Sequence, residues 1–237
     1  MTSADKKLPQ KSSKAAIDAF LEKVSSTPVT KSTGKRGRLI FAMDATASRE
    51  HAWDRACHIQ GEMFKETAAL GGLDIQLCYY RGFGEFKASQ WLSSSDELLK
   101  RMTGVSCQGG RTQIEKVLNQ AIKQTKQMKV QALVFVGDCM EEDVDQLCQL
   151  AGELGMLGVP AFLFHEGAEL EAQRAFKQIA RLTRGAYCSF DATSAGQLRD
   201  LLRAVAVYAA GGQSALQDFS KDRSEVVRKL TRQLGKE

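Results

Sequence analysis

The sequence predicts an α/β domain built on an open, doubly wound, mainly parallel sheet with helices on both faces. Continuous apolar runs alternate with helical patterns from about residue 37 to residue 210. Two runs, RLIFAMD at 38–44 and VQALVFVGD at 130–138, end in an aspartate and are typical of buried parallel strands. With 237 residues, 43% of them hydrophobic, the chain has the size of one ordinary domain with extensions.

The other elements follow in chain order. The alternating segment LDIQLCYY at 73–80 predicts a less central strand, and GFGEFKAS at 82–89 predicts a short antiparallel edge strand. SSDELLKRM at 94–102 starts with good N-cap residues and predicts a short helix. The remaining predictions are helices at about 50–70, 112–127, 141–155, 169–183 and 194–209, and strands at 159–164 and 186–190.

Two basic extensions are predicted to flank the domain at 37–210. Residues 1–36 combine a short amphipathic helix with a linker, and residues 211–237 form an amphipathic helix. Basic residues outnumber acids by five in the first extension and by two in the second, whereas acids outnumber bases by two between them. Solvated ends explain these charges better than nucleic-acid binding, which would run only through the basic tails. Docking of either helix on this domain and docking on a partner both remain open.

Composition predicts a cytoplasmic protein. The sequence has no run of 18 apolar residues, so no membrane span is expected. Its first residues lack the uninterrupted apolar region of a signal peptide. The six cysteines are scattered without a Cys-x-x-Cys pair, which favours reduced thiols over disulfides or a zinc site.

Five oxygen-bearing residues are predicted to meet at one edge of the sheet. Asp44, Thr46 and Ser48 are spaced by two on the turn that leaves the first buried strand. Thr112 comes shortly after a Gly-Gly pair, which permits a tight loop, and Thr112 is the first residue of a predicted helix. Asp138 ends the second buried strand. The carboxyl ends of parallel strands lie side by side, so these side chains should converge. Two carboxylates and three hydroxyls suit a hard divalent cation, Mg²⁺ (or Mn²⁺).

The pattern Asp-x-Thr-x-Ser, then Gly-Gly-x-Thr, then an apolar strand ending in Asp resembles the metal-ion-dependent adhesion site of von Willebrand factor A domains. The resemblance covers about residues 37–210, and the longer text is similar to bacterial stand-alone A-domain proteins. It implies Thr46, Ser48 and Thr112 as direct ligands, with Asp44 and Asp138 acting mainly through water. Two departures are Thr46 in place of the usual serine and Gly-Asp-Cys at 137–139 in place of Thr-Asp-Gly. Taken singly, Ser48 and Thr112 also fit helix N-caps, and Asp138 fits a strand-end cap.

A protein partner that supplies an Asp or Glu to the metal is the expected ligand of such a site. The expected partner-binding rim contains Glu85, Glu141, His165 and Glu166.

Other candidate chemistry is weaker. Glu141, Glu142, Asp143 and Asp145 suit a second cation site, but acids at a helix start explain them more simply. His51 and His58 are expected as surface or core residues rather than ligands, and a redox pair of Cys107 and Cys139 is a minor alternative.

The leading prediction is therefore a metal-dependent protein–protein interaction module. The alternative is a metal-dependent hydrolase or phosphoryl-transfer enzyme that uses the same site. Asp44-Ala45-Thr46 lacks the second acid of the Asp-x-Asp-x-Thr phosphatase pattern. The chain has no G-x-x-x-x-G-K-[ST] phosphate loop, and RGFGEFK at 81–87 lacks the third glycine of a dinucleotide fingerprint. The absence of these catalytic motifs favours a binding function over catalysis.

Overall fold

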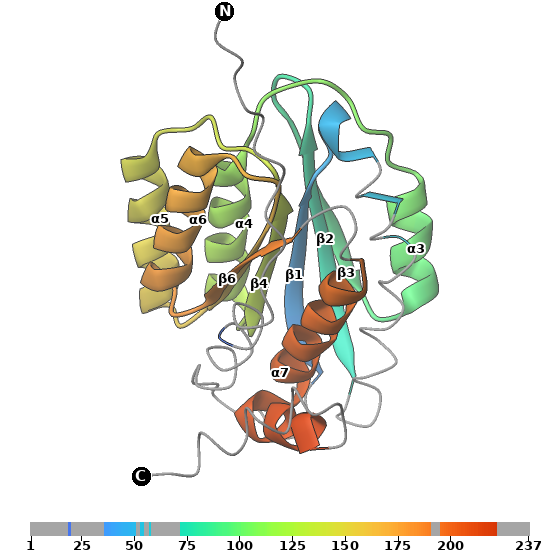
Figure 1. The fold of residues 1–237 in the computed structure, drawn as a ribbon. Helices are drawn as coiled ribbons and strands as arrows, with labels where there is room; N and C mark the ends of the chain where they lie inside the picture. Colours follow the sequence, from blue (N-terminus) through green and yellow to red (C-terminus); the bar gives the residue numbers. More distant parts are fainter. Residues whose placement is uncertain are drawn as a thin grey trace, which may run out of the picture.

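The computed structural model describes residues 36–50, 72–190 and 195–221, together with the isolated positions 19, 53, 54 and 57. Six strands form one sheet in the order β3-β2-β1-β4-β5-β6 (Figure 1). The strands are β1 (Gly37–Asp44), β2 (Leu73–Arg81), β3 (Glu85–Leu92), β4 (Ala132–Gly137), β5 (Ala161–Glu166) and β6 (Ala186–Phe190). Only the β2–β3 pair is antiparallel, which confirms the predicted parallel sheet and its antiparallel edge strand.

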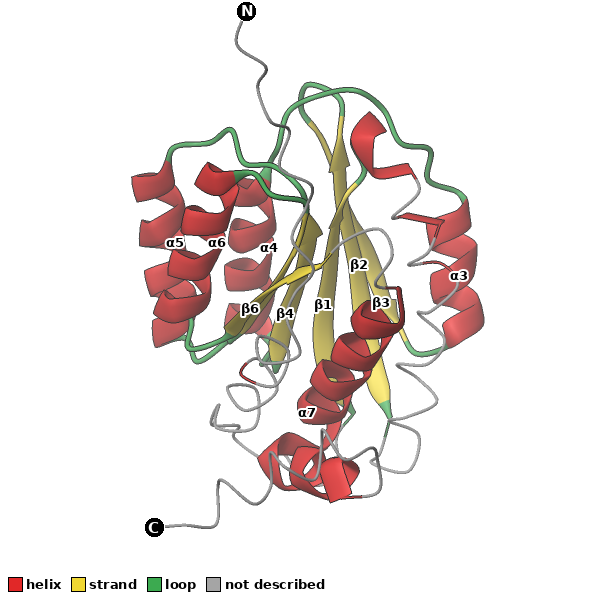
Figure 2. Cartoon of the chain, viewed as in Figure 1, coloured by secondary structure: helices red, strands yellow, loops and turns green. Residues whose placement is uncertain are grey.

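Helices cover both faces of this sheet. The described helices are η1 (Ala47–Arg49), α3 (Ser95–Thr103), α4 (Ile114–Gln127), α5 (Val144–Met156), α6 (Leu170–Leu182) and α7 (Ala195–Lys221). Helices α4, α5 and α6 lie on one face, and α3 and α7 lie on the other (Figure 2). Among the described residues, no helix is both long enough and apolar enough to cross a membrane.

The core consists of two apolar layers separated by the sheet. Successive residues of β1 alternate between them: Leu39, Phe41 and Met43 join the layer under α7, whereas Ile40 and Ala42 join the layer under α4 and α6. All five are fully buried. The continuous apolar run in the sequence is thus explained by a strand that is covered on both sides.

Several helix bounds differ from the sequence prediction. Helix α4 starts at Ile114, so Thr112 lies two residues before the helix, whose N-cap is Gln113. Helix α7 continues to Lys221 through a break at Gly212, where φ is 76°. The break separates two helical parts, in line with the predicted helices at 194–209 and within 211–237, and beyond it Leu216 is buried and Phe219 packs against the core.

Three predicted segments lie wholly or largely outside the described residues. These are the helix at about 50–70, the amphipathic face at 17–24 and the end of the C-terminal helix after 221.

The site residues lie at the carboxyl edge of the sheet. Met43 of β1 pairs with Val136 of β4, so the residues that follow these positions leave the sheet next to each other. The loop before α4 crosses this edge and is tied down by backbone bonds. Gln108 N donates to Ala45 O at 3.0 Å, and Arg111 N donates to Gly82 O in the β2–β3 turn at 3.1 Å.

Candidate metal and partner-binding site

Four of the five predicted site residues are joined by hydrogen bonds. Thr46 N donates to Asp44 Oδ1 at 2.7 Å, and the hydroxyls of Thr46 and Ser48 lie 3.3 Å apart. Ser48 Oγ donates to Asp138 Oδ2 at 2.8 Å. The turn after β1 and the end of β4 therefore meet through side-chain oxygens, as the spacing of the sequence motif predicts. Ser48 is exposed, so the cluster reaches the surface.

Asp44 carries a carboxylate in an unfavourable environment. The side chain has no exposed surface, and Tyr80 Oη donates to its Oδ2 at 3.2 Å. The pKa of Asp44 is raised from its ordinary value of 3.8 to about 6, chiefly by burial and to a smaller extent by the nearby charge of Asp138. Hydrogen bonds from the side chain and backbone of Thr46 and the charge of Arg49 offset part of this shift. A bound cation would favour the charged form of Asp44.

Thr112 is held by the two glutamates that follow Asp138. Its hydroxyl donates to Glu142 Oε2 and accepts from Glu141 N at 2.9 Å. Its backbone N donates to Glu141 Oε2 at 3.0 Å. Glu142 Oε1 also accepts from the backbone N of Ile114 and of Glu115, the latter at 3.2 Å, so Glu142 caps the start of α4.

The three hydroxyls share one feature that suits a cation. Ser48 donates its proton to Asp138, Thr112 to Glu142, and the Thr46 side chain hydrogen-bonds Asp44. A hydroxyl has two lone pairs in addition to its proton, so a hydroxyl that donates to a carboxylate keeps acceptor capacity for a metal.

Two further observations concern the type of ion. Asp138 Oδ1 is buried and has no hydrogen-bond partner within the described part of the chain. In the same residues, no three His, Cys, Asp or Glu side chains gather as a metal site. An ion here would therefore depend on hydroxyl oxygens with a few carboxylates. That donor set fits Mg²⁺ or Mn²⁺ better than a soft ion.

The expected rim needs one correction. His165 was predicted to face a partner, but it is fully buried on β5, which has neighbouring strands on both sides. Its Nε2 lies 3.1 Å from the Asp138 carbonyl oxygen and its Nδ1 lies 3.0 Å from Tyr187 Oη. Because a carbonyl only accepts, Nε2 carries the proton, and burial lowers the pKa of His165. His165 thus holds the Asp138 carbonyl group through this hydrogen bond.

The other rim residues already have partners. Glu85 receives two hydrogen bonds from Arg81, at 2.9 and 3.2 Å. Glu166 pairs with the buried Arg49. Glu141 is exposed while it bonds Thr112 N, so it remains accessible beside the site.

The weaker candidates have structural explanations or fall outside the described chain. Asp143 is the N-cap of α5 and accepts from Gln146 N at 3.0 Å. Glu142, predicted as a helix-start acid of α5, instead caps α4. The six cysteines are free, and burial raises the pKa of the Cys107 thiol to about 11. His51 and His58 lie outside the described residues.

Sequence reasoning missed two buried residues at the site. Tyr80 gave no signal beyond its place in an apolar strand, yet it donates to Asp44. Arg49 directly follows the motif residue Ser48 and is only 1% exposed, and a charged residue next to the motif was the available hint.

The loop before α4 makes Gly110 a sensitive position. A Cβ on Gly110 would lie 2.0 Å from Gly82 O, a backbone atom, so the loop or the β2–β3 turn would have to move. We expect Gly110→Ala to lower the free energy of unfolding by about 2 kcal/mol, as overpacking does. The displaced loop should also weaken divalent-metal affinity. Gly109→Ala is the control, because nothing lies within 4 Å of a Cβ there. Urea titrations in which both variants match the wild type would contradict this reading of the loop.

Comparison with known proteins supports the fold. No family model matches the sequence, and no curated protein does. Among solved structures, the chain is similar to the SpRpn10 VWA domain, with 13% identity and a TM-score of 0.56 over 75% of this chain and 97% of that one. It is similar to proximal thread matrix protein 1 from the mussel byssus, whose structure has a zinc-occupied MIDAS motif, with 13% identity and a TM-score of 0.59 over 73% of this chain and 46% of that one.

A third similar structure is the PilB minor pilin from Streptococcus sanguinis, with 9% identity and a TM-score of 0.56 over 78% of this chain and 64% of that one. The chain therefore spans less than two thirds of the pilin and of the thread matrix protein, but nearly all of the SpRpn10 domain. At these identities the likeness concerns the fold.

Proposed function

We propose that this chain, which has the von Willebrand factor A fold, is a metal-dependent protein–protein interaction module. Asp44, Thr46, Ser48, Thr112 and Asp138 would hold Mg²⁺ or Mn²⁺. A protein partner would complete the site with the carboxylate of an Asp or Glu.

The observation that carries the proposal is the pairing of hydroxyls with carboxylates at one edge of the sheet. Ser48 donates to Asp138, and Thr112 donates to Glu142, so both hydroxyl oxygens keep lone-pair capacity for an ion. The buried, unpartnered Asp138 Oδ1 adds a further acceptor, considered among the described residues. A known zinc-occupied MIDAS motif in a similar fold supports divalent-metal binding here.

Charge balance favours an acidic partner. Thr46, Ser48 and Thr112 would supply neutral direct ligands, while Asp44 and Asp138 would act mainly through water. A metal with neutral ligands keeps affinity for another carboxylate, and hard cations prefer such oxygens. Ser48 is exposed, so an incoming side chain can reach this part of the cluster. Binding rather than turnover is the proposed outcome.

Calorimetric titration with Mn²⁺ tests the site directly. We expect weak binding by the wild type, and at least tenfold weaker binding by Ser48→Ala, because one hydroxyl ligand is lost. Ser93→Ala is a matched control, since Ser93 is also exposed and donates to an aspartate, Asp74, at 2.8 Å. Its affinity should equal that of the wild type. Ca²⁺ should bind less well than Mn²⁺ if the site requires tight octahedral geometry. Equal Mn²⁺ affinity in the wild type and Ser48→Ala would refute the site assignment.

A further inference from the structure

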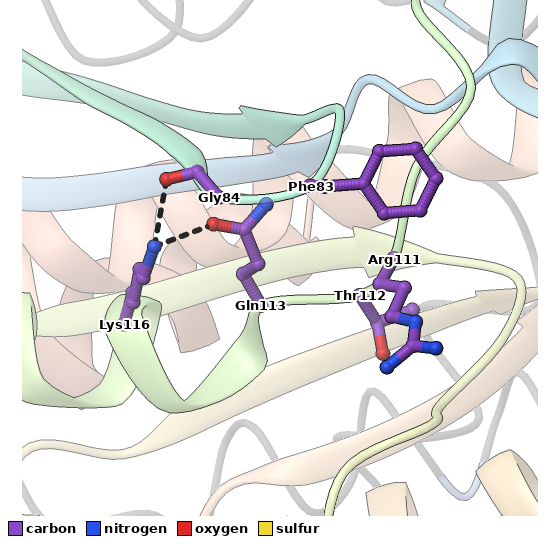
Figure 3. Close-up of a pocket in the computed structure, with 6 residues that line it drawn as sticks. All are labelled: Phe83, Gly84, Arg111, Thr112, Gln113 and Lys116. Atoms are coloured by element: carbon purple, nitrogen blue, oxygen red, sulfur yellow. Dashed lines mark hydrogen bonds between the residues drawn. The ribbon is translucent and has the colours of Figure 1, made fainter.

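A pocket of about 340 Å³ opens beside Thr112. It lies where the β2–β3 turn meets the start of α4 (Figure 3). Its lining residues are Phe83, Gly84, Arg111, Thr112, Gln113 and Lys116. Because Thr112 belongs to this lining and also to the proposed metal site, the two are adjacent.

The pocket carries positive charge that the described residues do not neutralise. Arg111 and Lys116 are both exposed, and neither forms an ion pair in the part of the chain that the structure describes. Among the described residues, Lys116 Nζ donates to two neutral oxygens, Gly84 O and Gln113 Oε1, both at 2.8 Å. These bonds hold the ammonium group in place at the pocket while its charge remains available.

The frame of the pocket is fixed by hydrogen bonds. Gln113 Nε2 donates to Arg81 O at 3.3 Å. Gln113 Oε1 accepts a hydrogen bond from Lys116 Nζ (Figure 3). Arg111 N bonds the carbonyl of Gly82 in the turn. Both sides of the pocket are therefore connected before any ligand arrives, which lowers the ordering entropy lost on binding.

An apolar side chain stands at the tip of the same turn. Phe83 is 87% exposed and lies between Gly82 and Gly84, which have φ angles of 58° and 148°. The turn thus presents an aromatic ring to solvent next to two cations. Aromatic side chains are favoured anchors in protein interfaces, so the ring offers an apolar contact beside the charged pocket.

We propose that this pocket receives a second acidic side chain of the partner, with Arg111 and Lys116 as its counter-charges and Phe83 as a platform for a neighbouring apolar residue. The inference rests on the proposed function, in which a first carboxylate binds the metal. The partner segment would therefore carry two acids a few residues apart. The charges favour a peptide over a nucleic acid, because the exposed Glu141 beside the site would repel a continuous line of phosphates.

Selection from a random peptide library tests this inference without a known partner. The full chain is immobilised in Mg²⁺, and enriched peptides are sequenced. We expect enrichment of two acidic positions at a fixed separation. Peptides selected by the double variant Arg111→Gln/Lys116→Gln should no longer be enriched in the acid that enters the pocket. They should still be enriched in the acid that binds the metal. A selected two-acid peptide should bind this variant about tenfold more weakly. Arg101→Gln/Lys123→Gln is the matched control, since it removes two exposed charges from α3 and α4 away from the pocket.

The selections separate the two proposals. If chelator abolishes acidic enrichment but the Arg111→Gln/Lys116→Gln variant selects the same two-acid peptides as the wild type, the metal site stands and the pocket assignment is wrong. If chelator has no effect while the variant loses the second acid, the pocket stands and the metal-dependent function is wrong. A wild type that enriches no acidic peptides would overturn both.

Discussion

Replacing Asp44 with asparagine is expected to stabilise the metal-free protein at neutral pH and to remove metal binding. The buried carboxylate has a pKa of about 6 in the fold, against 3.8 ordinarily. A shift of this size means that the charged form destabilises the folded state by about 3 kcal/mol above pH 6. Asparagine keeps an oxygen for Thr46 N but carries no charge, so it should recover up to this amount.

The raised pKa of Asp44 makes the stability of the folded protein depend on pH. Between about pH 4 and pH 6 the folded protein binds more protons than the unfolded chain, so wild-type stability falls as pH rises through this window. The advantage of Asp44→Asn should therefore be largest at pH 7.5 and vanish near pH 4. Metal affinity of the wild type should decrease as pH falls below about 6, because protons compete for Asp44.

Urea unfolding in chelator at pH 7.5, 5.5 and 4, with Mn²⁺ titration at pH 7.5, provides the measurement. Asp74→Asn is the control, because Asp74 forms a partly exposed pair with Arg36 and should change stability by less than about 1 kcal/mol. The interpretation fails if Asp44→Asn is less stable than the wild type at pH 7.5, or if it binds Mn²⁺ equally well. A stabilising variant without metal binding would show that Asp44 is retained for function at the expense of stability.

The sequence was sufficient for the sheet and for much of the site. Two apolar runs that end in aspartate predict central parallel strands, and strand order then brings Asp44 and Asp138 to the same edge. The observed contact from Ser48 to Asp138 spans 90 positions, yet it follows from strand adjacency. Their role as metal ligands stays a prediction. Local pattern and topology together therefore locate the segments.

Contacts made by long side chains across loops were not predictable in the same way. Glu142 was expected in the first turn of α5, but its side chain caps α4 and bonds Thr112. His165 was expected at the rim, but two neighbouring strands and the facing Phe176 ring bury it. In both cases tertiary packing determines where the side chain points, and periodicity carries no information about that direction.

The pocket beside Thr112 illustrates the same limit. Phe83 and Arg111 are separated by a strand and a helix in the sequence, and contacts such as the bond from Arg111 N to Gly82 O bring them to one surface. Gly110 permits this close approach because it has no Cβ. The sequence alone therefore gives no sign that Gly110 shapes a pocket.

The ion pair between Arg49 and Glu166 joins the turn after β1 to the end of β5. Arg49 is 1% exposed, and its Nη1 bonds Glu166. Its Nε and Nη2 have no hydrogen-bond partner among the described residues. Glu166 therefore supplies a counter-charge to a desolvated guanidinium. Glu166→Gln would leave that charge buried without its ion-pair partner and should lower the free energy of unfolding by about 3–5 kcal/mol.

A double variant distinguishes this mechanism from simple loss of a contact. Arg49→Met/Glu166→Gln removes the buried charge together with its partner, so it should recover most of the lost stability and could exceed the wild type. Glu153→Gln, which breaks the exposed pair with Lys126, should change stability by less than about 1 kcal/mol in the same urea titrations. If Glu166→Gln costs no more than Glu153→Gln, the pair does not hold the turn. If Glu166→Gln costs several kcal/mol and the double variant recovers this loss, the cost comes from leaving the buried Arg49 charge unpaired. The Arg49–Glu166 pair then connects the motif turn to β5.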